Sequence, residues 1–179
     1  MPFLPCCERM LVIMDHNLLI LGAGQYSFVV RETARAMGCF EKIDCLDDNH
    51  PNAIGTLSDY LKFTESYDTA FVAIGNPDLR LAWLEKLERA GYILPVLIHP
   101  KAYVSPSARV MGGSIVEPMA VVQSNAVVEK GCLICAGSIV NHNALVESGS
   151  QIDGGGIVMS NGAVPPGTKV SSGMVVQRN

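Results

Sequence analysis

A six-residue repeat constrains this chain more than any other feature. Every sixth residue from Val104 to Val176 is valine or isoleucine, without a slip or insertion. Four positions later the residue is small in nearly every repeat, and three positions later it is usually glycine or asparagine. A period of six fits neither an α-helix nor a flat alternating strand, whereas exact short repeats are typical of a parallel β-helix. We therefore predict a coil of short strands in which the β-branched residue points inward and the glycine or asparagine turns with positive φ.

The outward surface of this predicted coil carries a second pattern. In a three-sided coil, equivalent positions recur every third repeat, and the residue before each inward aliphatic should face outward. Two sides then carry apolar residues at this position: Val121, Ile139, Ile157 and Val175 on one, and Val127, Leu145 and Ala163 on another. The remaining side carries Ile115, Leu133, Gln151 and Lys169. Because apolar outer faces mark interaction sites, we expect a homo-oligomer, most simply a homotrimer of parallel coils.

The first half of the chain alternates predicted strands with predicted helices. Such alternation with short loops indicates a Rossmann-like α/β domain with a parallel sheet. We place this domain at residues 14–98, after a tail at 1–13, and the coil at 99–179, joined directly at His99 and Pro100. The predicted strands are Leu18–Leu21, Ile43–Leu46, Ala70–Ile74 and Leu94–Ile98, and the predicted helices are Val29–Met37, a short one capped by Thr56, and Asp78–Ala90.

Three loops of the first domain are candidates for a ligand site. Ligands of parallel sheets bind beyond the carboxyl ends of the strands, where Gly22–Ser27, Asp47–Asn49 and Gly75–Asn76 should converge. Glycines let the backbone approach a phosphate, and the N-terminus of the following helix favours the anion. The dinucleotide fingerprint needs a third glycine where Ser27 stands. A nucleotide ligand other than NAD is favoured, and a purely structural turn is the alternative.

Composition excludes several classes of partner. A net charge of -4 and a pI near 5.5 argue against nucleic acid and anionic membranes, and no apolar run is long enough to span a bilayer. Met1–Met14 lacks the features of a secretory signal, so we expect a cytoplasmic protein that starts naturally at Met1, Met10 or Met14. Cys132 and Cys135 have CxxC spacing only because of the repeat, so we expect reduced, hydrophobic cysteines and no metal site.

His142 is the candidate catalytic residue. It occupies a corner of the predicted coil, where glycine, proline, serine or alanine stands in most repeats. Histidine is the natural general base near neutral pH, although an exposed histidine without a function is the alternative. Asn143 follows it in the glycine and asparagine column, where a left-handed turn alone accounts for the residue.

Five segments share their order and spacing with one known family. They are Leu18–Ser27, Cys45–Asn49, Val72–Arg80, Leu97–Val110 and Ile139–Val146. On these segments the chain resembles the bacterial hexapeptide-repeat sugar acetyltransferases, the group that includes bacillosamine N-acetyltransferase and the sialic acid O-acetyltransferases. The resemblance implies a left-handed β-helix, a homotrimer, and acetyl-CoA bound along the later coils at a subunit interface.

The resemblance also implies roles for individual residues. The first domain would bind a nucleotide-activated sugar of bacterial glycan biosynthesis, and His142 with Asn143 would catalyse direct acetyl transfer to a sugar amine or hydroxyl. Gly155 would lie in the acetyl-CoA region. The nucleotide-sugar contacts carried over by position are Gly24, Gln25, Tyr26, Asp47, Asp48 and Gly75.

The chain departs from the family at three places. The family usually has an acidic residue where Asn143 stands and a second histidine, associated with acetyl-CoA, where Gln151 stands. We also expect family members to continue their coil beyond Asn179. The alternative function is therefore a family member that binds a nucleotide sugar or a partner without transferring acetyl groups.

Overall fold

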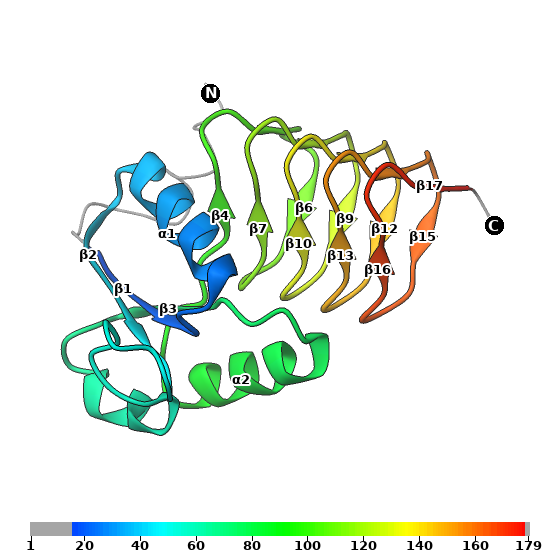
Figure 1. The fold of residues 1–179 in the computed structure, drawn as a ribbon. Coiled ribbons are helices and arrows are strands. Elements are labelled where there is room, and N and C mark those ends of the chain that lie inside the picture. Colours follow the sequence, from blue (N-terminus) through cyan, green and yellow to red (C-terminus); the bar gives the residue numbers. More distant parts are fainter. Residues whose placement is uncertain (1–15, 178–179) are drawn as a thin grey trace.

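The computed structural model describes residues 16–177, which form an α/β domain followed by a long coil of short strands (Figure 1). The predicted tail at 1–13 and the candidate start residues Met1, Met10 and Met14 lie outside the described residues. The predicted division after residue 98 stays a prediction.

The α/β domain is built on a three-stranded parallel sheet in the order β2-β1-β3. Successive residues of a strand point to opposite faces, so Leu18 and Ile20 share a core with α1 while Leu19 and Leu21 share one with α2. The predicted strands and helices of this domain are confirmed up to α2. Its elements are β1 (His16–Leu21), α1 (Gln25–Met37), β2 (Phe40–Leu46), the 3-10 helix η1 (Leu57–Phe63), β3 (Thr69–Val72) and α2 (Pro77–Arg89).

The prediction of a fourth strand in this sheet at Leu94–Ile98 is wrong. Only Ile93 continues the sheet, through a single parallel bridge to Thr69. The strand itself is β4 (Leu97–Ile98), and it pairs with a strand of the coil. Ile98 stands six residues before Val104, so the repeat begins one step earlier than its first recognised member.

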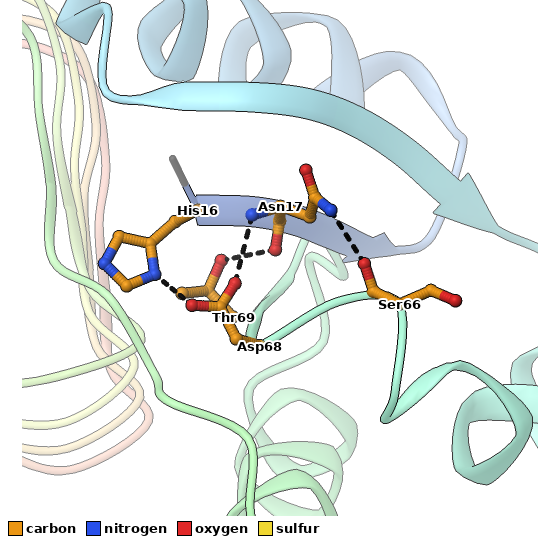
Figure 2. A network of polar contacts seen from close by, with 5 residues as sticks. All are labelled: His16, Asn17, Ser66, Asp68 and Thr69. Carbon is orange, nitrogen blue, oxygen red and sulfur yellow. Dashed lines mark hydrogen bonds and ion pairs between the residues drawn. The ribbon is translucent and has the colours of Figure 1, made fainter. Parts of the chain in front are cut away.

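A network of polar contacts connects the amino-terminal ends of β1 and β3 (Figure 2). His16 Nδ1 pairs with the carboxylate of Asp68, which also accepts the Asn17 backbone N–H at 3.0 Å. The Thr69 hydroxyl donates to the Asn17 carbonyl at 2.9 Å, and the Asn17 amide donates to the Ser66 carbonyl at 2.8 Å. These contacts stabilise the sheet edge opposite the carboxyl ends of the strands.

The coil is a left-handed parallel β-helix, as predicted. Two-residue strands from β4 to β17 form three parallel sheets, which we call the domain side (β4, β7, β10, β13, β16), the second side (β5, β8, β11, β14, β17) and the third side (β6, β9, β12, β15). The strands after β4 are Tyr103–Val104, Arg109–Val110, Ile115–Val116, Val121–Val122, Val127–Val128, Leu133–Ile134, Ile139–Val140, Leu145–Val146, Gln151–Ile152, Ile157–Val158, Ala163–Val164, Lys169–Val170 and Val175–Val176.

The three columns of the repeat have the predicted roles. The inward aliphatics form one core with small residues such as Ala126 and Cys132. The turn column adopts positive φ, including Asn125, Asn143 and Asn161. Met119 occupies the same column at φ 63, although left-handed backbone is unfavourable for such a side chain.

The α/β domain packs on the domain side of the coil. Leu97, Ile115 and Leu133 are buried in one core with Leu18 and Ile20, so the apolar part of this side is covered within the chain. The helix α2 lies along the adjoining corners of the coil (Figure 1). A Cβ added at Gly113 would lie 2.6 Å from Leu84, and one added at Gly149 would lie 2.9 Å from Leu81. Glycine at these corners suits the positive φ of the turn and lets the leucine side chains of α2 approach closely.

Candidate active site

The three predicted loops converge at the carboxyl ends of the parallel strands. Ala23 donates its N–H to Asp47 Oδ2 at 2.8 Å, and Asp47 Oδ1 accepts the N–H groups of Asn49 and His50 at 2.9 and 3.0 Å. A Cβ on Gly22 would lie 3.0 Å from the Ala73 carbonyl oxygen. The N–H groups that donate to Asp47, with that of Ala23 contributing most, lower the pKa of the Asp47 carboxyl below its usual value. Asp47 therefore joins two of the loops to each other.

Open space surrounds the glycines of this site. A Cβ added at Gly24 or Gly75 would meet nothing within 4 Å, and Gln25 beside Gly24 is exposed. Gly24 is the N-cap of α1, which has neither a side-chain cap nor an acidic residue in its first turn. Unpaired N–H groups at a helix N-terminus favour an anionic ligand. Asp48 lies nearby and is exposed, and its Oδ1 accepts the Leu57 N–H at 3.0 Å.

Tyr26 directs its hydroxyl away from this space and into the coil. The hydroxyl donates to Glu117 Oε1 at 2.9 Å, and Glu117 Oε2 accepts the Ala136 N–H at 3.0 Å. Burial, together with the Glu117 carboxylate, raises the pKa of Tyr26 well above its usual value. The phenol is therefore a protonated donor between the two domains.

Arg80 is a buried cation that the sequence analysis did not single out. Its guanidinium, on α2, is fully buried and donates only to backbone carbonyl oxygens. Burial lowers its pKa. The acceptors are Ile74 and Gly75 of the loop after β3, at 2.7 and 2.9 Å, and Gly131 and Gly149 of the coil, at 2.8 and 2.7 Å. Arg80 thus holds the Gly75 loop against the coil.

His142 is exposed at the corner between the second and third sides of the coil. Its Nδ1 lies 3.1 Å from the Ser160 hydroxyl, one coil further on. Within residues 16–177, no carboxylate forms an ion pair or hydrogen bond with this imidazole. Asn143, at φ 58, donates its N–H to the Ser124 carbonyl at 3.0 Å, which confirms its role in the turn.

The structure separates His142 from the loops of its own α/β domain. That domain packs on the domain side, and the corner with His142 joins the other two sides, so it is the corner opposite. Gly155 lies at yet another corner, between the domain side and the second side, with φ 69. Gln151 lies on the domain side, where its amide donates to Asp153. Within one chain, the loops of the α/β domain therefore lie together and His142 lies apart from them.

Two further properties bear on the possible chemistry. Within residues 16–177, no group of histidine, cysteine, aspartate and glutamate is arranged to hold a metal ion. No helix in the same range is long and apolar enough to cross a membrane.

The family of this chain follows from its similarity to known proteins. Residues 17–87 match the family model of the PglD N-terminal domain. The structure of the acetyltransferase domain of PglB from Neisseria gonorrhoeae FA1090 is 32% identical over 92% of this chain and 83% of that chain, with a TM-score of 0.86. The chain belongs to the sugar acetyltransferase family. The resemblance inferred from the five sequence segments is thereby confirmed.

Other structures of the family carry ligands. The PglB domain in complex with acetyl coenzyme A is 31% identical over the same shares of the two chains, with a TM-score of 0.85. A histidine-to-alanine variant of GDP-perosamine N-acetyl transferase from Caulobacter crescentus, in complex with CoA and GDP-perosamine, is 25% identical. It covers 89% of this chain and 92% of that chain, with a TM-score of 0.54. No curated protein sequence matches this chain.

Proposed function

We propose that this protein transfers an acetyl group from acetyl-CoA to an amino or hydroxyl group of a nucleotide-activated sugar. The observation that carries the proposal is the 32% identity with an acetyltransferase domain over 92% of this chain. A structure of that same domain holds acetyl coenzyme A.

The α/β domain is the proposed site of the nucleotide sugar. The N-terminus of α1 after Gly24 would accept the diphosphate, because its N–H groups and dipole favour negative charge. Gly24, Gln25 and Gly75 leave room for the ligand. Asp48 keeps one carboxylate oxygen for the ribose or the sugar, whereas Asp47 would act by fixing the loop.

His142 is the proposed general base. Its Nε2 would take the proton from the sugar amine or hydroxyl as the nucleophile attacks the thioester carbonyl carbon. The new C–N or C–O bond forms, the C–S bond breaks, and the departing thiolate receives the proton from His142. A backbone N–H at a coil corner would stabilise the oxyanion. The Ser160 hydroxyl, at Nδ1, would orient the ring.

The complete active site would require more than one chain. We propose a homotrimer in which His142 of one chain faces the α/β domain of a neighbour, with acetyl-CoA along the later coils near Gly155. In support, the second and third sides present half-exposed apolar residues that a neighbour would cover, namely Val121, Ile139, Ile157, Val127, Leu145 and Ala163.

A second function is favoured by the surroundings of His142. No carboxylate contacts the imidazole within residues 16–177, and Asn143 and Gln151 replace residues that the family uses. A protein that binds a nucleotide sugar without acetylating it would also retain the open loops of the α/β domain.

An assay of His142→Ala separates the two functions. We expect acetyl transfer from acetyl-CoA to a panel of nucleotide-linked amino sugars, with a turnover roughly 10²–10⁴-fold lower in the variant and an unchanged oligomer by light scattering. His16→Ala, which removes a histidine at the opposite edge of the α/β domain, is the control and should keep its activity. Binding of the sugars without any turnover by the unmodified protein would instead establish the binding function.

A further inference from the structure

Glu117 and Glu129 occupy equivalent positions in the coil, directly after an inward valine. Each carboxylate accepts a backbone N–H from the next coil at 3.0 Å, that of Ala136 for Glu117 and that of Ser148 for Glu129. Each glutamate therefore satisfies a corner N–H group that would otherwise lack an acceptor. This structural role is common to both residues.

Glu117 has an additional contact outside the coil. Its other oxygen accepts the Tyr26 hydroxyl at 2.9 Å, although the two residues are 91 positions apart in the sequence. Glu117 is only 7% exposed, and a hydrogen bond to a carboxylate is stronger and more directional when it is shielded from water. The coil thereby holds one defined side chain of the α/β domain.

That side chain belongs to the first turn of α1. The loop before the helix is held internally by Ser27, whose N–H and hydroxyl both donate to the Gly24 carbonyl, at 2.9 and 2.7 Å. Gly24, the N-cap of this helix, supplies no side-chain cap. Apolar packing holds α1 on the coil, and the hydrogen bond from Tyr26 to Glu117 adds a directional contact at the first turn, where the N–H groups lie.

We propose that Glu117 is a positioning residue for the nucleotide sugar. Through the Tyr26 hydroxyl, this corner of the coil fixes the first turn of α1, and with it the N–H groups that receive the diphosphate. The inference rests on the proposed function. It also gives Tyr26 a role other than the direct ligand contact expected from the sequence: its side chain orients the site, and its backbone N–H contributes to it.

The test compares two variants of this contact with a matched control. Tyr26→Phe removes only the hydroxyl, and Glu117→Gln removes the charge of the acceptor. Glu129→Gln makes the same change at the same position of another repeat, on a carboxylate whose described hydrogen-bond partner is Ser148 of the coil. Calorimetric titration with UDP and with GDP, which carry the diphosphate without the sugar, measures the affinity of each variant.

We expect Tyr26→Phe and Glu117→Gln to bind the preferred nucleotide roughly tenfold more weakly than the unmodified protein, the size of a lost charge-assisted hydrogen bond. Combining the two changes should cost no more than either alone, because both remove one interaction. The melting temperature should fall in both Glu117→Gln and Glu129→Gln, because each change weakens the acceptor of a corner N–H group. In an acetylation assay, KM for the acceptor should rise while kcat is kept.

Two results would overturn this inference and leave the proposed function standing. In one, Tyr26→Phe binds the nucleotide with the affinity of the unmodified protein. In the other, Glu129→Gln loses as much affinity as Glu117→Gln. A protein that binds neither nucleotide before any substitution would overturn the proposed function, and this inference with it.

Discussion

At the scale of single residues, His142 has no carboxylate partner among residues 16–177. Its described polar neighbour is the Ser160 hydroxyl, and the adjacent residue is the amide Asn143. A carboxylate beside an imidazole stabilises its protonated form, whereas the Asn143 amide carries no charge.

Replacing Asn143 with aspartate should increase the rate of acetyl transfer, by up to about tenfold at neutral pH, because the carboxylate stabilises the imidazolium formed in the reaction. Aspartate tolerates the left-handed backbone that this position requires, so the fold should be kept. Asn125→Asp, at φ 57 in the same column, is the control and should not change the rate. Absence of activity in both Asn143→Asp and the unmodified protein would favour the binding function.

Met119 is strained by its position in the turn column. Its φ of 63 costs an ordinary residue about 1–2 kcal/mol, which glycine avoids. Met119→Gly should raise the free energy of unfolding by about 1 kcal/mol, after the entropic cost of glycine is included. Met111→Gly, at an exposed corner position without positive φ, should lower it instead. Urea denaturation measures both, and a loss of stability in Met119→Gly would show that the turn is not strained.

The sequence predicts the turn column well, because a repeat samples the same backbone position many times. It could not predict that Met119, which stands where most repeats have glycine or asparagine, adopts the same positive φ. Nor could it predict the Tyr26 contact with Glu117, because no local pattern relates two residues so far apart in the chain.

At the scale of secondary-structure elements, α2 connects the two parts of the molecule. Leu81 and Leu84 pack against glycine corners, and Arg80 donates to carbonyl oxygens of both parts. A buried guanidinium without a carboxylate partner is rare, and removing it leaves its carbonyl acceptors unpaired.

Arg80→Met should therefore lower the free energy of unfolding by about 2–4 kcal/mol, since a buried acceptor left unsatisfied costs about 1–3 kcal/mol and part of the loop can regain water. The exposed Arg89 on the same helix offers the control, and Arg89→Met should change the stability by less than about 0.5 kcal/mol. Chemical denaturation followed by tryptophan fluorescence reports on this region, because Trp83 also lies on α2. Equal stability of the two variants would contradict the connecting role of Arg80.

The elements of the α/β domain were predicted because strand and helix periods differ clearly there. The error at Leu94–Ile98 has a physical cause: a short apolar run has no period of its own. Leu97 and Ile98 are apolar because they belong to the coil, and the packing of the two parts decides which sheet they join. Arg80 was missed for a related reason, since an arginine on a helix is usually exposed.

At the scale of the whole molecule, the α/β domain covers one side of the coil and leaves His142 at the opposite corner. The repeat predicted that two sides are apolar. It could not show that Ile115 and Leu133 are buried within the chain. An outward apolar residue can pack against a domain of the same chain or against a neighbouring chain, and the repeat does not distinguish the two. The separation of the ligand loops from His142 leads to the central claim, that the active site combines residues of neighbouring chains.

A subunit-mixing experiment tests this claim most directly. His142→Ala disables the proposed base. Gly24→Trp should fill the proposed ligand space and keep the fold, because a Cβ added at Gly24 meets nothing within 4 Å. Each variant alone should keep no more than about a hundredth of the unmodified activity. If each site combines His142 of one chain with the α/β domain of another, random trimers of both variants should recover about a quarter of the unmodified activity. Mixed trimers assembled from equal amounts of the two variants that remain inactive would contradict a shared site.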